Sequence, residues 1–490
     1  MPTDFPKADT IPMYEENLEL LINGRWCQGS EGQTLPLQNP ATGAVIATIP
    51  CASADDLDRA LEASQRAFED WKQLTAAQRW GYLSKAASLL EERMATLSRV
   101  LTQENGKSLQ EANGEIQFCA DAIRWYAEEG KRAYGRIIPA RSPNVRQSVL
   151  REPVGPALGF AAWNFPAGNV ALKIAAALAA GCSIIVKPSN ETPGTAVGIA
   201  RCFQDAGVPA GVIGLVFGPP GPISEHLIAS PIPKKVSLTG STPVGKHLQK
   251  LAAETLKRCT MELGGHAPVL VFADANLERT LDMLVASKFR NAGQVCTSPT
   301  RFFIHRSIYE AFIAGFVERT RRLVVGNGLE KGVNMGPLIT ERRLDNMDEL
   351  VSDAVARGAQ VLTGGSRLER EGFFFAPTVL RDVPDDALIM NDEPFGPIAP
   401  LTVFDEFDEV IQRANALPYA LAAYIFTRDS TTAARASQAI EAGVVGVNHM
   451  SVHEAETPFG GFNESGYGHE SGQEGLDAYL RTKMIADAHA

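Results

Sequence analysis

The sequence predicts an α/β protein with two lobes, each built on a parallel β-sheet. The length supports two or three lobes, because 490 residues exceed the size at which a single hydrophobic core stops growing. A hydrophobic content of 45% and a charged content of 21% are ordinary for a globular protein. Helical periodicity dominates residues 53–127, and from residue 155 short β-rich runs alternate with turns and helices.

A helical layer is expected first, followed by a series of parallel strands. In the helical layer apolar residues recur at spacings of three and four, for example at Leu57, Ala60 and Leu61. Each strand after it is followed by a turn and a helix, an order typical of βαβ units. These strands are expected at Pro156–Ala162, Ser183–Val186, Val212–Phe217 and Lys235–Leu238.

A second series of strands indicates a second α/β lobe. Helical segments such as Leu277–Asn291 and Ile308–Val324 separate its strands. Between the two series, Glu262–Gly265 contains a Gly-Gly pair that suits a chain passing from one lobe to the other. Residues 130–152 suggest a protruding hairpin. The second series is expected at Pro268–Phe272, Arg301–His305, Leu401–Phe404, Ala422–Phe426 and Val444–Val447.

Charge and cysteine usage narrow the class of protein. A net charge of −11 without a basic block argues against nucleic acid as a partner. The opening residues 1–20 are acidic and do not read as a secretion signal. The most apolar stretch, Val170–Ile185, is interrupted by Lys173 and Gly181, so no membrane span is expected. Seven scattered cysteines without a Cys-x-x-Cys pair predict reduced thiols in a cytoplasmic protein, with no metal site.

Three segments follow predicted strands, at the edge where open parallel sheets bind ligands. Asn164 could donate its amide to an oxyanion, although an isolated asparagine more often caps a loop. The ammonium of Lys187 could bind ribose or phosphate, or lie at a solvated strand end. Leu238–Gly245 is a Gly-flanked turn that opens a helix, which suits a phosphate or simply allows tight packing.

Three reactive side chains complete the candidates. Cys296 lies in a small polar stretch after a helix, where a thiolate can form, although most cysteines are structural. Glu262, expected after a helix rich in Lys and Arg, could be a general base or an ordinary ion-paired residue. Glu393 precedes a Pro-rich turn and could be no more than a turn residue.

Together, and in this order, these segments closely resemble the aldehyde dehydrogenase superfamily over nearly the whole chain. The matching motifs are Trp163-Asn164-Phe165-Pro166, Lys187-Pro188, Gly240-Ser241-Thr242-Pro243-Val244-Gly245, Glu262-Leu263-Gly264-Gly265, Gly293-Gln294-Val295-Cys296, Glu393-Pro394-Phe395-Gly396-Pro397 and Pro458-Phe459-Gly460-Gly461.

The resemblance implies an aldehyde dehydrogenase-like fold with two Rossmann-like lobes and a β-arm for oligomerisation. The cofactor-binding domain would comprise residues 1–128 and 152–263, and the catalytic domain residues 264–450. The arm and C-terminal tail would comprise residues 129–151 and 451–490. In the family the arm adds a strand to a neighbouring subunit, so a homodimer or homotetramer is implied.

The resemblance also implies the chemistry. Cys296 would attack the aldehyde, the Asn164 amide and the Cys296 N–H would hold the oxyanion, and Glu262 would activate the hydrolytic water. A nicotinamide cofactor would be held by Lys187 at the adenosine ribose and by Glu393 at the nicotinamide ribose. The other implied cofactor contacts are Trp163, Ser189, Asn190, Gly240, Ser241 (at the pyrophosphate), Gly245, Leu263, Gly264 and Phe395.

Within the superfamily the chain is most similar to succinate-semialdehyde dehydrogenases, on the runs Phe289–Gln294 and Ala179–Cys182. The resemblance implies that Arg290 faces the substrate carboxylate; the alternative is a structural ion pair. Two departures leave another small or medium aldehyde open: Leu172 replaces a second substrate arginine, and Ser298 replaces a second cysteine. The further substrate contacts expected are Thr297, Phe165 and Phe459.

Asn190 bears on the choice of nicotinamide cofactor. Many NAD-dependent relatives have a glutamate at this position, which would repel a 2′-phosphate. A neutral Asn190 therefore predicts that NADP is accepted as well as NAD, unless the adjacent Glu191 turns inward and restores the repulsion. Two rival functions remain: transfer of the thioester to coenzyme A, which the presence of Glu262 disfavours, and a non-catalytic nucleotide-binding protein, which would not need Cys296 or Glu262.

Overall fold

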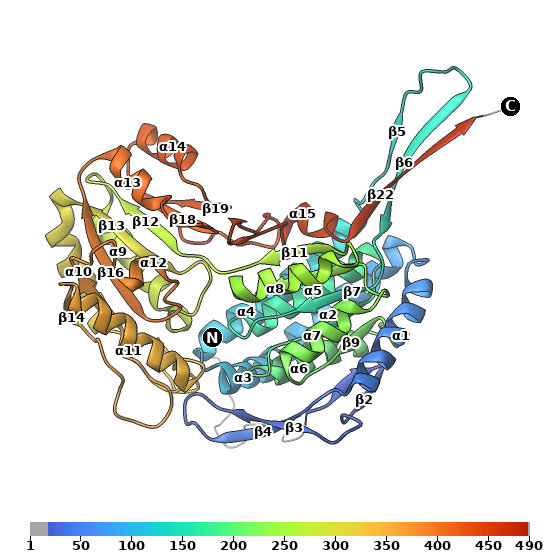
Figure 1. Ribbon diagram of the computed structural model, residues 1–490, viewed down its shortest axis with the longest axis horizontal. Coiled ribbons are helices and arrows are strands. Elements are labelled where there is room, and N and C mark those ends of the chain that lie inside the picture. Colours follow the sequence, from blue (N-terminus) through green and yellow to red (C-terminus); the bar gives the residue numbers. More distant parts are fainter. Residues whose placement is uncertain (1–17, 489–490) are drawn as a thin grey trace, which may run out of the picture.

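The computed structural model describes residues 18–488. Most of the acidic opening segment, residues 1–17, therefore lies outside the described residues. Two sheets with their covering helices lie side by side, and a narrow arm projects away from them (Figure 1). Within residues 18–488, no helix is both long and apolar enough to cross a bilayer.

The first sheet has a parallel centre, in the order β9-β8-β7-β10-β11, and antiparallel edges. The central strands are buried along their length, which explains their continuous apolar runs. In sheet order the strands are β2 (Arg25–Cys27), β1 (Leu20–Ile22), β9 (Ile213–Leu215), β8 (Ile184–Lys187), β7 (Ala157–Phe160), β10 (Lys235–Thr239), β11 (Arg258–Glu262) and β21 (Gly466–Tyr467).

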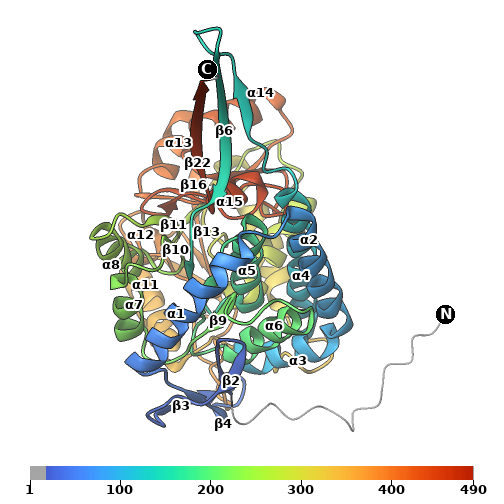
Figure 2. The same cartoon turned by 90° about the vertical axis from the view of Figure 1, so that its right-hand side faces the viewer.

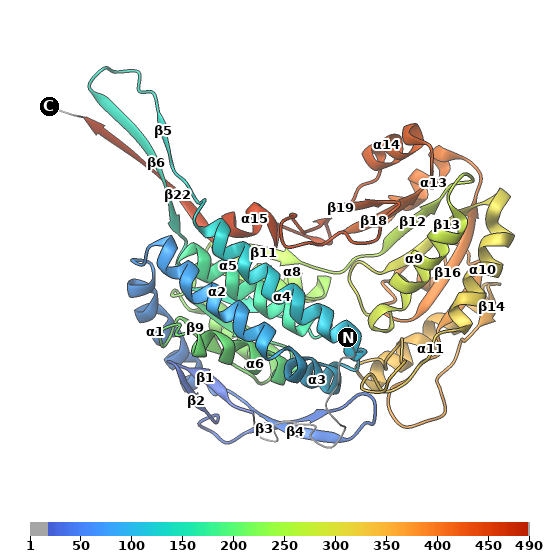
Figure 3. The ribbon, with the colours of Figure 1, turned by 180° about the vertical axis from the view of Figure 1, so that it is seen from behind.

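Helices cover both faces of this sheet (Figures 2 and 3). Three helices pack on one face of the sheet. Two helices pack on the other face, and three more helices cover those two on the side away from the sheet. The first group is α1 (Ala54–Trp71), α7 (Pro220–Ala229) and α8 (Thr242–Ala253). The second is α5 (Pro166–Ala180) and α6 (Pro193–Asp205), covered by α2 (Ala76–Glu92), α3 (Met94–Asn105) and α4 (Leu109–Gly130).

The second sheet is parallel except at its β14 edge. In sheet order its strands are β14 (Gln360–Thr363), β15 (Thr378–Arg381), β16 (Ile398–Phe404), β13 (Pro299–His305), β12 (Ala267–Val271), β18 (Ala422–Phe426) and β19 (Val444–Val447). Its helices are α9 (Leu277–Phe289), α10 (Tyr309–Arg321), α11 (Glu341–Ala356), α12 (Leu388–Asn391), α13 (Phe407–Ala414) and α14 (Ser430–Ala439), with the 3-10 turns η1 (Arg290–Gly293) and η2 (Arg306–Ile308).

The hairpin expected within residues 130–152 is confirmed. Its strands β5 and β6 form the arm together with β22, which pairs with β6 from Leu480 opposite Pro153 to Ala488 opposite Val145. A second hairpin, formed by β3 (Thr34–Gln38) and β4 (Val45–Pro50), contacts the second lobe. The N–H of Phe373 donates to the carbonyl of Pro40, in the turn of this hairpin, at 2.9 Å. The remaining elements are β5 (Arg136–Ile138), β6 (Val145–Pro153), β22 (Leu480–Ala488), α15 (Gly472–Asp477), β3 (Thr34–Gln38), β4 (Val45–Pro50), β17 (Tyr419–Ala420) and β20 (Phe462–Asn463).

Two local expectations are wrong. Glu262 does not follow a helix: it ends β11, because residues 258–262 pair in parallel with β10. Lys187 is not at a solvated strand end, because its side chain is buried. One expected helix is also shorter, since α9 ends at Phe289 and the chain then turns through η1.

Candidate active site

The candidate residues of the first lobe meet at one edge of its sheet. Strands β8, β7, β10 and β11 are parallel neighbours, so their carboxyl ends lie together. Lys187 ends β8, Asn164 lies shortly after β7, Gly240 follows β10 and Glu262 ends β11. The sheet order therefore brings together residues from four separate motifs.

A cavity of about 420 Å³ lies between this edge and the second lobe. It is lined by the expected catalytic residues Asn164, Glu262 and Cys296. If each of these residues had only a separate structural role, there would be no reason for all three to line the same cavity. The expected substrate contacts that also line it are Phe165, Arg290, Thr297 and Phe459.

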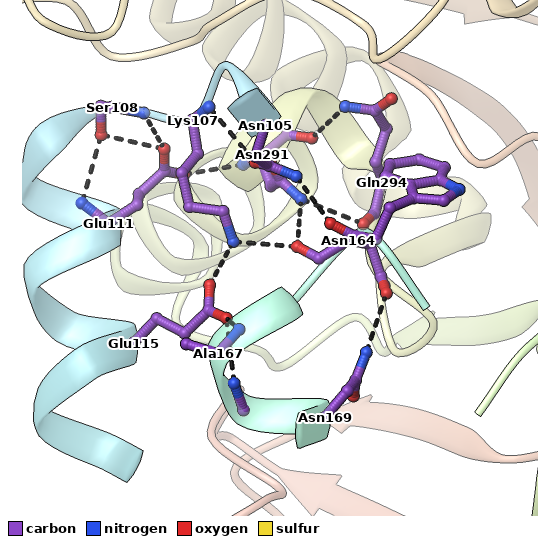
Figure 4. Close-up of polar contacts among 12 residues, drawn as sticks. Asn105, Lys107, Ser108, Glu111, Glu115, Asn164, Ala167, Asn169, Asn291 and Gln294 are labelled. Atoms are coloured by element: carbon purple, nitrogen blue, oxygen red, sulfur yellow. Dashed lines mark hydrogen bonds and ion pairs between the residues drawn. The ribbon is translucent and has the colours of Figure 1, made fainter. Parts of the chain in front are cut away.

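A buried hydrogen-bond network holds Asn164 in place (Figure 4). The carbonyl oxygen of Asn164 accepts from Lys107 Nζ at 2.9 Å and from Asn291 Nδ2 at 3.0 Å. Its side-chain oxygen faces Asn169 Nδ2 at 3.5 Å. With the oxygen so engaged, the amide nitrogen is the group that Asn164 can offer to the cavity.

The Lys107 ammonium is itself paired. It forms a buried ion pair with Glu115, whose other oxygen accepts the backbone N–H groups of Ala167 at 2.8 Å and Gly168 at 3.1 Å. These N–H groups belong to the first turn of α5, where a carboxylate is favoured by the helix dipole. The network thus joins the loop between α3 and α4, where Lys107 lies, to α4 and α5 beneath Asn164.

The turn before Cys296 has unusual backbone geometry. Asn291 and Ala292 have φ values of 48° and 53°, a left-handed conformation that non-glycine residues rarely adopt. Gly293 follows with φ 73°, and a Cβ there would lie 2.1 Å from the carbonyl oxygen of Gly396. Asn291 stabilises the turn by donating to the carbonyl of Gln294 at 3.3 Å as well as to Asn164.

Glu262 and Cys296 have strongly perturbed acidities. Burial raises the pKa of Glu262 to about 8, and the nearby carboxylate of Glu470 adds to the shift. Burial also raises the pKa of the Cys296 thiol well above its usual range, assisted by Glu262 and Glu393. A buried Glu262 oxygen, Oε1, has no hydrogen-bond partner among the described residues. Glu262 is therefore a carboxyl group with unusual basicity and a free oxygen beside the thiol.

The Gly-flanked turn after β10 combines packing with anion-binding potential. A Cβ at Gly245 would lie 2.5 Å from the Leu263 side chain, so this glycine is needed for packing. Ser241, the N-cap of α8, makes no side-chain capping bond and is exposed. Its hydroxyl and the N–H groups of the first helical turn are available to a phosphate.

Glu393 approaches the first lobe from the second. Its carboxylate accepts the Gly265 N–H at 3.2 Å, and a Cβ at Gly264 would lie 2.6 Å from its other oxygen. Phe395 packs edge-on against Trp163, with ring centroids 5.4 Å apart. The N-terminus of α8, the strand-end side chains and the Glu393 carboxylate lie along the sheet edge that faces the second lobe, and a surface with groups of these kinds fits a dinucleotide.

At the far end of this surface, Lys187 Nζ donates to Asn190 Oδ1 at 3.1 Å. Asn190 Nδ2 in turn donates to the carbonyl of Gly218 at 2.9 Å. The Ser189 hydroxyl donates to the carboxylate of Glu191. Burial lowers the pKa of Lys187 to about 8, and the nearby Glu191 partly offsets the shift.

Several residues that line the cavity escaped the sequence analysis. Lys107, Glu115 and Phe118 come from the helical layer, where their periodicity indicated only packing. His453 and Glu470 come from the segment expected to be a tail. Helical spacing places Glu115 and Phe118 on one face of α4, but nothing local shows that this face meets Asn164.

Comparisons with known proteins agree with this geometry. A family model described as the aldehyde dehydrogenase family matches residues 26–485. The chain is 46% identical to 4-(hydroxymethyl)benzenesulfonate dehydrogenase TsaD1 of Comamonas testosteroni, over 95% of this chain and 97% of the relative. It is 40% identical to succinate-semialdehyde dehydrogenase [NADP(+)] GabD of Escherichia coli (strain K12), over 95% and 97%. The structure of succinate-semialdehyde dehydrogenase from Burkholderia pseudomallei superposes with a TM-score of 0.96 at 39% identity, covering 98% of this chain and 99% of that one.

The fold and the site define an NAD(P)-dependent oxidoreductase that acts on aldehydes. The chain belongs to the aldehyde dehydrogenase family.

Proposed function

We propose that this enzyme oxidises an aldehyde with a remote anionic group to the carboxylic acid, and that succinate semialdehyde is the first candidate among aliphatic aldehydes. The supporting observation is the state of Arg290. Its exposed side chain lines the same cavity as Cys296, and no ion pair involves it within residues 18–488. A guanidinium without a counter-ion beside the nucleophile suits a substrate carboxylate.

The first step forms a covalent bond to Cys296. The sulfur attacks the carbonyl carbon and the thiol proton passes to Glu262, whose raised pKa makes it a better base than an ordinary carboxylate. The developing oxyanion accepts from the Asn164 amide and the Cys296 backbone N–H. A nicotinamide cofactor, when bound, would supply the hydride acceptor. Loss of hydride from this carbon leaves a thioester on Cys296.

The second step is hydrolysis. After Glu262 has released the thiol proton to solvent, it takes a proton from water and the water oxygen attacks the thioester carbon. The carbon–sulfur bond then breaks to release the acid, and the Cys296 sulfur regains the proton held by Glu262. Glu262 carries this role because its Oε1 has no competing partner. Transfer to coenzyme A instead of water would make Glu262 dispensable.

For the cofactor, we propose that Lys187, Ser189 and Asn190 bind the adenosine ribose and that Ser241, with the N–H groups of Thr242 and Val244 in the first turn of α8, binds the pyrophosphate. Glu393 would hold the nicotinamide ribose, flanked by Trp163, Leu263, Gly264 and Phe395. NADP is accepted as well as NAD, because neutral Asn190 does not repel a 2′-phosphate. Glu191 carries the remaining negative charge here, so Glu191→Gln is expected to raise the kcat/KM ratio of NADP to NAD severalfold.

We further propose the domain division expected from the sequence, a cytoplasmic location and a homodimer or homotetramer. The arm supports the last point, because it leaves large apolar side chains in solvent: Tyr134 is 74% exposed, Ile137 65% and Met484 59%. Light scattering after size exclusion gives the subunit number, and a monomer at micromolar concentration would contradict the assembly.

The substrate proposal is tested by kcat/KM for succinate semialdehyde against uncharged butanal, with Cys296→Ala as the blank and without coenzyme A. A preference of about tenfold or more for the semialdehyde, about 1.4 kcal/mol, is expected. Equal rates would remove the anionic-substrate proposal and leave the family assignment intact.

A sulfonate-bearing aldehyde is the second candidate. Arg290 can bind sulfonate oxygens as it binds a carboxylate, and a 46% identical relative is named for a sulfonate. Competition between 3-sulfopropanal and succinate semialdehyde separates the two: the sulfonate is preferred if its kcat/KM is the larger.

A further inference from the structure

Phenyl and imidazole rings line much of the cavity beside Cys296, and a short aliphatic aldehyde would leave part of the cavity empty. His453 stacks on Phe459, with ring centroids 4.0 Å apart and planes 15° from parallel. Phe118 meets the edge of His453 at 5.1 Å. With Phe165, which lies beside Arg290, four rings from three segments of the chain line one space.

His453 contributes a flat neutral ring rather than a charge. Its Nε2 pairs with the Ser471 hydroxyl at 2.9 Å, which fixes the plane of the ring. Burial lowers the pKa of His453 to about 4, so the imidazole is neutral near pH 7. It therefore cannot serve as a carboxylate-binding cation.

The wall formed by α5 is also without a free cation. Leu172 is buried and lines the cavity. The ammonium of the adjacent Lys173 is directed to Thr239 Oγ1 at 2.6 Å and to the carboxylate of Glu470. Of the cations that line the cavity in the described chain, Lys107 is paired with Glu115, which leaves Arg290 as the unpaired one.

This combination selects a substrate shape. A volume of about 420 Å³ is in the range of sites for drug-sized ligands. Aromatic walls gain most from another ring, through stacked and edge-on contacts. The Arg290 guanidinium lies 4.9 Å from the Phe165 centroid, so charge and ring surface adjoin.

We propose that the preferred substrate is an aryl aldehyde with an acidic group across the ring from the formyl carbon, and that His453 determines this preference. The acidic group rests on the proposed function, in which Arg290 binds an anion. The ring-binding role does not depend on it.

The test uses four aldehydes that separate the ring from the charge: 4-formylbenzoate, benzaldehyde, succinate semialdehyde and butanal. We expect kcat/KM to be about tenfold higher for each ring compound than for its chain counterpart of equal charge. In His453→Ser this ring-to-chain ratio falls about tenfold, whereas His453→Phe retains it. Because aryl and alkyl aldehydes differ in intrinsic reactivity, the change of ratio between variants is the decisive quantity.

The outcomes are distinguishable. An unchanged ring-to-chain ratio in His453→Ser overturns the ring site, even if both acids outperform their neutral counterparts. A ratio that falls in His453→Ser while the acids show no advantage supports the ring site and contradicts the anionic-substrate proposal. Equal melting temperatures of the two His453 variants show that both are folded, and Val452→Ala is the control for the same segment.

Discussion

The polar groups in and near the cavity fall into two regions. In one region the groups have hydrogen-bond or ion-pair partners, and in the other they lack them. Beneath Asn164, each polar group of the network has a partner: Lys107 pairs with Glu115, and Glu115 caps α5. On the other side, Glu262 Oε1 lacks a partner and Arg290 lacks an ion pair within the described chain. Lys288, which precedes Arg290 by two positions but does not line the cavity, is buried with its ammonium unpartnered within the described chain.

The difference indicates a division of work. Partnered groups fix geometry, because each hydrogen bond restricts the positions of two atoms. Unpartnered groups keep their charge or basicity available, at the cost of an unsatisfied site in the resting protein. Substitutions in the first region should therefore impair every substrate alike, and those in the second should alter one chemical step, one substrate class or stability alone.

The largest effect is expected at Glu262. Glu262→Gln should lower steady-state kcat by about 10²–10⁴-fold, because it removes the base for hydrolysis. The carboxylate is the active form, so kcat of the unmodified enzyme should rise with pH through the Glu262 pKa of about 8 and then level off. Steady-state rates from about pH 6 to about pH 10 measure this. A variant with the same rate and pH profile would contradict the assignment.

Asn164→Ala should lower kcat by about 10²–10³-fold for all aldehydes, since it removes an oxyanion donor. The matched control is Asn169→Ala, which removes a neighbouring amide that donates to the Ala162 carbonyl at 3.2 Å and to the Asn164 side-chain oxygen at 3.5 Å but leaves the Asn164 amide itself in place. Its effect should be much smaller. If the loss of kcat in Asn164→Ala differed strongly from one aldehyde to another, Asn164 would be assigned to substrate binding instead.

Lys288→Met should raise stability on the order of 2 kcal/mol near pH 7. Burial lowers the pKa of Lys288 to about 7. Between that value and about 10.4, the unfolded chain binds a proton that the folded chain does not, so this group makes stability fall as pH is lowered through that window. Melting temperatures across this range should show the Met variant's advantage shrinking toward about pH 10.

A matched control comes from the partnered region. Lys107→Met leaves Glu115 buried without its counter-ion, so it should lower the melting temperature. Destabilisation by Lys288→Met as well would mean that Lys288 has partners in solution, and would weaken the comparison between the two regions.

The smallest effect is expected at Arg290. Arg290→Gln should lower kcat/KM for anionic aldehydes by about tenfold and leave butanal nearly unchanged, because the guanidinium is exposed and makes no ion pair within the described chain. Rates for the two substrates with one enzyme preparation give the answer. An equal loss for both would assign Arg290 to the fixed region.

Sequence analysis anticipated the parts of the molecule that are locally encoded. The buried strands β7, β8 and β10 and the residues Asn164, Glu262 and Cys296 lie in short motifs with a recognisable order. The β11 strand was missed because its charged start, Arg258, and its charged end, Glu262, hid a strand whose last three residues are buried in the sheet. The short N-terminal strands β1 and β2 have too few residues to show periodicity.

The rest depends on contacts between distant segments. Lys107 reaches Asn164 from 57 positions away, and Lys173 reaches Glu470 from 297 positions away. The pairing of β22 with β6 spans more than 320 positions, as at Arg481 and Glu152. No local pattern distinguishes such residues from ordinary core or surface positions, so the cavity walls, including His453, could not be read from spacing.

Asn291 has a consequence for turnover. It belongs to the second lobe, yet it donates to the Asn164 carbonyl of the first lobe and also to the Gln294 carbonyl beside the nucleophile. A hinge motion that parted the lobes would break the hydrogen bond between Asn291 and the Asn164 carbonyl and would disassemble the oxyanion site with every cycle. We therefore expect spent cofactor to leave by sliding along a closed interface, so that its release rate responds to the viscosity of the medium far less than a clamshell opening would.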